Sequence, residues 1–384
     1  MKILYHHRIA SKDGQYVHIE EIVNALKELG HEIIIVEPSS ITDKQFGKSS
    51  GTVARLRCFL PGMVHECLEF LYSIYDFLKL CRVIIQARPD FIYERYNLFF
   101  PSGIWAKQLF KLPLILEVNA PLYQERDSND GISLKNFAVW TEGYVWRSAD
   151  LVLPVTQALA EIIKTRNVDE NKIVVIPNGI NRDGRFNKKT QSDTIKDKYQ
   201  LHDKLVLGFT GFVRTWHRLD KVLDVIGRHK DDNWHFLLVG DGPVRAELEK
   251  QAKTLGIENR VTFSGLVNRQ EMPDYVAAFD IALQPDVVPY ASPLKLFEYM
   301  GFGKAILAPD RNNIKEILTD EEDCLLFSVD KEDDFIEKLE TLAGSKDLQN
   351  KLGMGAINTV NDKGLYWQEN ANKIVQLYSR LQHK

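Results

Sequence analysis

The sequence is poor in cysteine: its 384 residues include only four, Cys58, Cys67, Cys81 and Cys324. None of them forms a Cys-x-x-Cys pair, which argues against a zinc ribbon or a redox motif of the thioredoxin kind. A chain of this length with so few cysteines does not need disulfides, so we expect it to fold in the reducing cytoplasm.

The sequence also lacks a large excess of charge of one sign and a long apolar run. Its net charge is -4, so the basic surface of a nucleic-acid-binding protein is missing and we expect no nucleic acid partner. No uncharged apolar run reaches the roughly 18 residues of a membrane-spanning helix. The chain begins with a strand-like KILY, not with the basic stretch and apolar core of a secretory signal.

The charges are distributed unevenly. Residues 1–190 contain 24 Lys and Arg against 22 Asp and Glu, and the remainder contains 25 against 31. Either the first half meets an anionic partner or surface, or the difference is random scatter.

What is present is an alternation of apolar strands with amphipathic helices. The strand-like residues 2–5 precede a helix whose apolar side chains recur at helical spacing up to Gly30, and a second strand follows at residues 32–36. The pattern continues with strands at residues 91–96, 112–118, 151–155 and 172–177. It predicts an α/β protein whose parallel sheet is covered by helices on both faces.

A polar segment, residues 181–202, interrupts this alternation before it restarts at residue 204, and it is the best linker candidate. We therefore predict two Rossmann-like, doubly wound domains, residues 1–188 and 189–365, facing across a cleft. Ligands of such folds bind at the carboxyl ends of the strands. A last helix within residues 366–384 is expected to pack back on the first domain.

Residues 57–85 are rich in Phe, Leu and Tyr with scattered charges. One interpretation is an amphipathic helix in peripheral contact with a membrane or facing a lipidic acceptor, which would place the protein at the inner face of the membrane. The other is a helix buried in the first domain.

A glycine turn is the first candidate for a phosphate site. The strand that restarts the pattern ends at Gly211, and the backbone amides of such a turn can approach phosphate oxygens. Arg214, His217 and Arg218 lie in or just after the turn and can neutralise a diphosphate. A purely structural glycine explains the turn equally well.

The string PYASPLKLFEYMGFG is more informative. Ser292 is a good N-cap, with Pro293 at the first helical position. The amides of Leu294 and Lys295 then point out of the helix start, and Glu298 lies one turn deeper on the same face. This suits a nucleotide, with phosphates at the amides and ribose hydroxyls at Glu298; the alternative is that Lys295 and Glu298 are solvated charges.

Other candidates lie where further strands end or the first helix starts. In the first half they can position sugar hydroxyls, bind phosphate or transfer a proton, and in the second half they can line the nucleotide. They are Gly14, His18, Glu117 and Asn119, and Gly240, Gly242, Leu266 and Val267.

Six strings, in order, resemble glycosyltransferase family four, retaining enzymes of the GT-B fold: GQYVHIEEIVNALKELGHEI, VIPNGI, GFTGFVRTWHRLDKVL, LLVGDGP, VTFSGLV and SPLKLFEYMGFGKAILA. The resemblance covers nearly the whole chain. It implies a hexosyltransferase that holds a UDP- or GDP-linked sugar with its second domain and a glycan or lipid-linked sugar acceptor with its first, in cell-surface polysaccharide synthesis. Such enzymes use no cofactor and usually no metal, which agrees with the absence of Asp-x-Asp from these strings.

The sequence departs from the family pattern in the first half and at the donor sugar. The family has two glutamates separated by seven residues; the second matches Glu298, but Tyr290 stands in the place of the first. Asn119 stands where a histidine is usual, and Asp13 and Gly14 stand where the family has paired glycines.

Beside the diphosphate, the resemblance implies an arginine and a lysine near Phe212 and His217, and neither matches. Arg214, Arg218 or Lys295 would have to replace them.

The resemblance also implies the mechanism. The acceptor attacks from the front face, the leaving phosphate takes its proton, and the amides and cations around the diphosphate stabilise the developing charge. Glu298 would fix the ribose, while His18, Glu117 and Asn119 would orient sugar and acceptor.

Alternatives remain open: an epimerase or phosphorylase on the same fold, or a non-catalytic partner that only binds nucleotide sugars. A dinucleotide-dependent oxidoreductase is disfavoured, because the first strand and turn lack G-x-G-x-x-G.

Overall fold

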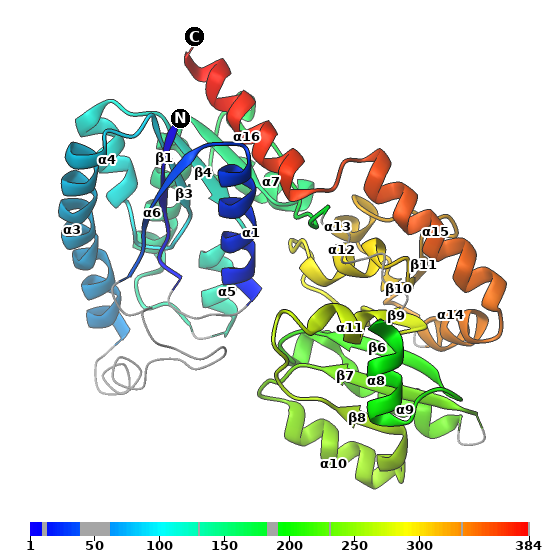
Figure 1. Cartoon of the computed structure of the whole chain (residues 1–384). Coiled ribbons are helices and arrows are strands. Elements are labelled where there is room, and N and C mark those ends of the chain that lie inside the picture. Colours follow the sequence, from blue (N-terminus) through cyan, green and yellow to red (C-terminus); the bar gives the residue numbers. More distant parts are fainter. Residues whose placement is uncertain are drawn as a thin grey trace. The chain divides into compact units, whose positions relative to one another are not determined.

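The computed structural model describes residues 1–9, 14–38, 62–129, 131–182, 191–229, 232–331 and 333–382. The chain divides into two compact units, each built around one sheet (Figure 1). Unit 1 comprises Met1–Pro177, Tyr290–Ser292 and Trp367–Lys384, and unit 2 comprises Asn178–Pro289 and Pro293–Tyr366.

Unit 1 contains a five-stranded parallel sheet in the order β2-β1-β3-β4-β5. Every residue of β3 and β4 is buried, as expected of strands covered on both faces. The strands are β1 Lys2–His6, β2 Glu32–Val36, β3 Phe91–Arg95, β4 Leu114–Val118 and β5 Leu151–Pro154. The helices are α1 Gly14–Glu28, α3 Gly62–Ala87, α4 Ser102–Phe110, α5 Leu122–Asn129, α6 Lys135–Ser148, α7 Gln157–Lys164 and α16 Trp367–Gln382.

Unit 2 contains a six-stranded parallel sheet in the order β11-β10-β9-β6-β7-β8. The strands are β6 Leu205–Thr210, β7 Trp234–Val239, β8 Val261–Phe263, β9 Ile281–Leu283, β10 Ala305–Pro309 and β11 Leu325–Phe327. The helices are α8 Gln191–Tyr199, α9 Leu219–Arg228, α10 Arg245–Leu255, α11 Met272–Ala277, α12 Leu294–Gly301, α13 Asn312–Lys315, α14 Asp334–Ala343 and α15 Lys346–Asp362.

Two local expectations are wrong. Residues 172–177 form no regular strand: Val174 and Ile176 donate to the carbonyls of Val152 and Pro154, but Pro154 has no N–H to return a bond, and Ile173 makes only an isolated bridge to Val152. Residues 181–202 are not a linker throughout, since Gln191–Tyr199 form α8, which buries Ile195 and packs on α11.

The last helix, α16, packs against α1 within unit 1, although some 340 residues separate them in the chain. Its Asn370 donates to the carbonyl of Pro177 at 2.7 Å, and Phe91 stacks on Tyr378 with 4.4 Å between ring centroids. The end of the chain therefore completes the core of the unit in which the chain begins.

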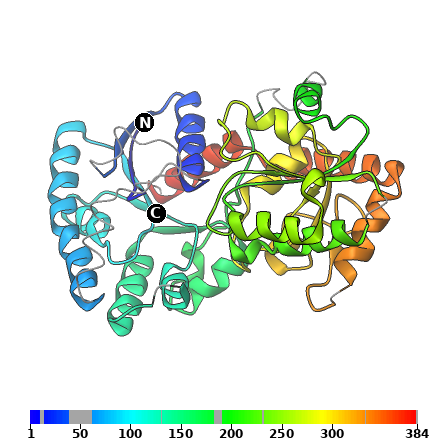
Figure 2. The ribbon, with the colours of Figure 1, turned by 90° about the horizontal axis from the view of Figure 1, so that it is seen from below.

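Helix α3 runs along the outside of unit 1 (Figure 2) with an inverted pattern of burial. It buries the polar side chains of Glu66, Ser73 and Asp76. Its exposed side chains include eight large apolar ones, Met63, Val64, Leu68, Leu71, Ile74, Tyr75, Leu78 and Ile85. The exposed apolar side chains are those expected of an amphipathic helix, and Leu80 and Ile84 are buried as expected of a helix of the first domain, but neither interpretation anticipated the buried polar side chains. Residues 57–61 of the segment singled out from the sequence, like Asp13, lie outside the described residues.

Candidate functional site

The turns that follow β6, β7 and β8 are joined through their backbones at the carboxyl edge of the unit 2 sheet. The amide of Gly211 donates to Val239, that of Val213 to Asp241 and that of Gly240 to Gly265, all at 2.9–3.0 Å. A Cβ on Gly240 would lie 2.0 Å from the carbonyl oxygen of Gly211. These glycines therefore let two backbones meet and fix the Gly211 turn, with or without a ligand.

Gly242 has the same structural role. A Cβ at this position would lie 2.1 Å from the carbonyl oxygen of Val213, so a larger residue would push the β7 turn away from the β6 turn.

Helix α12 begins one residue later than the sequence predicts. Pro293 is its N-cap residue, with an extended ψ of 115°, and Leu294 is the first helical residue. The prediction that Ser292 caps the helix and that Pro293 is its first residue is therefore wrong; Ser292 is buried and belongs to unit 1. The amides of the first turn, including those of Leu294 and Lys295, have no partner within the helix.

Lys295 places a buried cation beside the Gly211 turn. Within the described part of the chain, its Nζ is buried and makes no hydrogen bond. The nitrogen lies 3.6 Å from the centroid of the Phe209 ring, and a Cβ on Gly211 would be 3.2 Å from it. Burial lowers the pKa of Lys295 to about 7, against the opposing charge of Glu298. An unpaired buried ammonium is unfavourable, and an anion at the turn would relieve it.

Glu298 lies on the same helix, one turn deeper. Burial raises its pKa to about 7, while Arg269 and Lys295 act in the opposite direction. Arg269, which follows β8, was not predicted from the sequence. The signal that could have indicated it is a basic residue shortly after a strand, in the string VNRQ.

The position of α12 is fixed by its Tyr299, another residue that the sequence analysis missed. The hydroxyl of Tyr299 accepts a hydrogen bond from the amide of Thr210 at 2.8 Å, at the end of β6. This bond holds α12 against the strand that leads into the Gly211 turn.

The basic residues of the β6 turn do not converge on Lys295. The guanidinium of Arg214 lies over the rings of Phe212 and Trp216, at 4.6 and 5.4 Å from their centroids. Arg218 is exposed and pairs with Asp220 at 3.4 Å.

His217 contributes no charge to the turn. Its ring packs on Phe209, and its Nδ1 accepts a hydrogen bond from the backbone amide of Arg214 at 3.2 Å. Burial, helped by Lys295 and Arg214, lowers the pKa of His217 to about 2, so the imidazole is neutral. Arg214, Arg218 and Lys295 were the predicted replacements for the family's arginine and lysine. Of these three, Lys295 has the buried charged atom beside the Gly211 turn.

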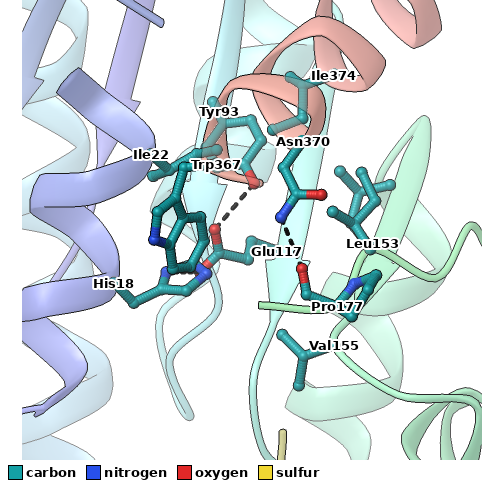
Figure 3. A pocket seen from close by; sticks show the side chains of 11 residues that line it. His18, Ile22, Tyr93, Glu117, Leu153, Val155, Pro177, Trp367, Asn370 and Ile374 are labelled. Atoms are coloured by element: carbon teal, nitrogen blue, oxygen red, sulfur yellow. Dashed lines mark hydrogen bonds and ion pairs between the residues drawn. The ribbon is translucent and has the colours of Figure 1, made fainter. Parts of the chain in front are cut away.

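In unit 1, His18 and Glu117 come together in a buried network (Figure 3). Glu117 accepts hydrogen bonds from Arg95 at 2.9 Å and from Tyr93 at 2.9 Å, and Arg95 also contacts Nδ1 of His18 at 3.1 Å. Burial lowers the pKa of His18 to about 4, and its ring packs edge-on against Trp367 of α16. The cavity beside them measures about 10 Å³, room for a water molecule but not for a sugar.

The remaining candidates are spread over both units. Asn119 follows β4, and its buried Oδ1 has no partner in the part of unit 1 that the structure describes. Gly14 opens α1, with open space where a Cβ would lie. Leu266 and Val267 follow β8, and Leu266 is half exposed.

Tyr290 belongs to unit 1. Its hydroxyl donates to Glu125 at 2.6 Å, and its carbonyl accepts from Thr156 at 2.9 Å. Burial, followed by the Glu125 carboxylate, raises the pKa of Tyr290. Among the described residues no group of three or more His, Cys, Asp or Glu side chains is arranged to hold a metal ion.

Two family models match the chain: Glycosyltransferase Family 4 over residues 12–183 and Glycosyl transferases group 1 over residues 204–345. The 2-deoxystreptamine glucosyltransferase of Streptomyces kanamyceticus is 24% identical over 196 residues, 48% of this chain and about half, 50%, of that enzyme's length. An uncharacterized glycosyltransferase of Methanocaldococcus jannaschii is 21% identical over 383 residues, 96% of this chain and 95% of that one.

Among solved structures, Anabaena HepE in complex with UDP is similar to this chain with a TM-score of 0.75 at 16% identity, over 99% of this chain and 100% of that one. The likeness confirms the predicted fold, two Rossmann-like domains of the GT-B type. The two family models match successive parts of the chain and together cover most of it. The chain therefore belongs to glycosyltransferase family 4 and is a transferase.

Proposed function

We propose that the protein transfers a sugar, with retention of configuration, from a nucleotide-diphosphate sugar to a glycan or glycolipid acceptor in cell-surface polysaccharide synthesis. The observation that carries this proposal is the unpaired ammonium of Lys295 at the Gly211 turn, beside the start of α12. A diphosphate there would receive a cation, the turn amides and the amides of a helix N-terminus.

A uridine nucleotide is the donor that we expect. Anabaena HepE, which has the same fold, has been solved with UDP and with UDP-glucose. In this chain Glu298 would accept the ribose hydroxyls, and Leu266 and Val267 after β8 would contact the base. The relatives leave the sugar and the acceptor unassigned.

The proposed reaction requires no protein nucleophile. The bond from the sugar C1 to the leaving phosphate oxygen breaks, the acceptor oxygen bonds to C1 on the same face, and the leaving phosphate takes the acceptor proton. Charge grows on the diphosphate during this step, so Lys295 and the amides around it bind the transition state more tightly than the donor. The protein would need neither a cofactor nor a metal ion, because Lys295 supplies the positive charge at the leaving group.

Calorimetric titration with UDP, GDP and ADP, in buffer containing EDTA, tests the donor. We expect micromolar binding of UDP and weaker binding of the other two. Turnover of UDP-linked sugars with an acceptor then distinguishes a transferase from a partner that only binds them, and the anomeric signal of the product by NMR reports retention or inversion. Failure of a folded protein to bind any of the three nucleotides would refute the donor assignment.

We also propose peripheral membrane contact through α3, at the inner face of the membrane. Its outward apolar row, from Met63 to Ile85, supports this proposal, because buried apolar area drives interfacial binding. No helix in the described residues is long and apolar enough to span a bilayer.

Co-sedimentation with liposomes tests the contact. Leu71→Glu and Leu78→Glu should each weaken binding, whereas Met354→Glu, a matched single change at an exposed methionine of α15, should leave it intact. Self-association of the wild-type protein without liposome binding would instead show that a second copy covers this row.

A further inference from the structure

The sheet of unit 1 has a topological switch point between β1 and β3. Its order, β2-β1-β3-β4-β5, means that the chain moves outward in one direction from β1 and in the other from β3. Ligands of open α/β sheets bind outside the carboxyl ends of the two strands at such a point. The residues there are His7 and Arg8, which follow β1, and the segment up to Phe100, which follows β3.

At this point Arg8 is held between two aromatic rings. Its guanidinium carbon lies 4.4 Å from the ring centroid of Tyr72 in α3 and 4.8 Å from that of Phe100. Its Nη1 donates to Asp76 of α3 at 3.0 Å. The planar group is thus clamped in one orientation, which reduces the entropy lost when it binds a second partner.

Asp76 contacts a second cation besides Arg8. Its second oxygen, Oδ2, accepts a hydrogen bond from Ser102 at 2.7 Å and lies 2.8 Å from Nε2 of His6. Nδ1 of His6 lies 2.8 Å from Glu94, and these carboxylates outweigh the effect of burial and raise the pKa of His6 to about 9. Asp76 therefore faces two cations, His6 and Arg8.

Polar atoms without partners gather at the same strand end. In the described residues, the hydroxyl of Tyr5 and Nε of Arg8 are buried and make no hydrogen bond. Each such group carries an unfavourable free energy that most proteins avoid. Two such atoms within four consecutive residues, at the point where the topology places a ligand, indicate a polar binding site.

We propose that Arg8 binds an anionic group of the acceptor, a carboxylate or a phosphate ester, so that acidic or phosphorylated sugars are the preferred acceptor class. The inference rests on the proposed transferase function and assigns the acceptor side of it. A guanidinium with a free edge matches either oxyanion in bidentate geometry. The slight excess of positive charge in residues 1–190 agrees with an anionic partner for this half of the chain.

The test measures binding of glucose, glucuronate and glucose 6-phosphate by ligand-detected NMR, with the protein saturated with UDP so that the donor phosphate site is occupied. We expect glucuronate or glucose 6-phosphate to bind at least tenfold more tightly than glucose, and the better of the two identifies the oxyanion. Equal affinity for all three would overturn the proposal. Absence of UDP binding in the first step would instead contradict the proposed donor function, so the two failures are distinguishable.

Two variants connect the binding to Arg8. Arg8→Gln should remove the preference for acidic sugars while leaving UDP affinity unchanged, and Arg8→Lys should retain part of it because the charge remains. Arg166→Gln is the matched control, since Arg166 also pairs with a buried carboxylate, Glu142, and lies 5.6 Å from the ring of Tyr123. An unchanged preference in a folded Arg8→Gln variant would overturn the assignment, and the wild-type comparison remains decisive if that variant does not fold.

Discussion

The ammonium nitrogen of Lys295 lies 3.6 Å from the centroid of the Phe209 ring. The ring face compensates part of the cost of burying the charge, by about 0.5–2 kcal/mol. The Phe209 ring accepts no conventional hydrogen bond. The three N–H groups of the ammonium therefore remain available to the oxygen atoms of a ligand at the Gly211 turn. In the proposed function, this contact keeps the ammonium available to the diphosphate.

Replacing Lys295 should stabilise the empty protein while it weakens nucleotide binding. Lys295→Met removes an unpaired buried charge and keeps an unbranched side chain over Phe209, so we expect about 1–3 kcal/mol of added stability. Urea unfolding measures the gain, and calorimetry should show at least a tenfold loss of UDP affinity. Arg218→Gln is the control, because Arg218 is exposed and paired, and it should change neither quantity. A destabilised Lys295→Met protein with normal UDP affinity would show that the lysine is structural.

The affinity for UDP should fall as the pH rises above about 7. In the free protein, burial lowers the pKa of Lys295 to about 7, and only the protonated amine attracts the diphosphate. Binding must therefore raise this pKa, and above pH 7 each pH unit should lower the affinity by up to tenfold until the pKa of the complex is reached. Titrations from pH 6 to 9 measure the slope. An affinity independent of pH in the wild-type protein, or the same slope in Lys295→Met, would exclude Lys295 as the group responsible.

Glu298→Ala should weaken nucleotide binding through the ribose alone. We expect a loss of about 1.5–3 kcal/mol in UDP affinity, the range for hydrogen bonds to a charged group, with a nearly unchanged melting temperature. Binding of inorganic pyrophosphate, which has no ribose, should change little when it is measured at pH 6, below the pKa of Lys295 in the wild-type protein. If UDP and pyrophosphate lose affinity equally, Glu298 acts by positioning Lys295 and not as a ribose ligand.

Gly240→Ala should destabilise the protein by pushing apart the turns that follow β6 and β7. The new Cβ would lie 2.0 Å from the Gly211 carbonyl oxygen, and the φ of Gly240 is +133°, which side chains other than hydrogen rarely tolerate. We expect a destabilisation of at least about 2 kcal/mol in urea unfolding. Gly14→Ala is the matched control, because a Cβ there meets open space in a helix and should be neutral or stabilising. Equal stability of the two variants would contradict the close approach of the β6 and β7 turns.

Strand and helix periodicity was sufficient to predict the α/β class and most elements, because buried parallel strands and amphipathic helices carry strong local signals. The features that could not be predicted depend on contacts between residues that are far apart in the sequence. Residues 172–177 have strand composition, but their ladder depends on Pro154 of the neighbouring strand. The contact of His18 with the ring of Trp367, which comes from the far end of the sequence, could not be predicted from the local pattern either, and the expected contact of His18 and Glu117 with substrate stays a prediction.

The candidate donor site shows the same division. The string around Lys295 and Glu298 predicted both residues as site candidates, but their charge states depend on burial that no local pattern reveals. The buried polar residues of α3 could not be predicted either. Asp76 is buried because it pairs with His6, the last residue of β1, and with Arg8, which follows that strand.

The central claim, that the Lys295 ammonium anchors the diphosphate of a nucleotide donor, is tested most directly by titrating UDP and uridine into the wild-type and Lys295→Met proteins at pH 6.5. The account predicts that the wild-type protein binds UDP at least a hundredfold more tightly than uridine, and that Lys295→Met loses at least tenfold of this preference while its affinity for uridine stays the same. An identical preference in the two proteins would contradict the account, because the diphosphate would then be held by other groups.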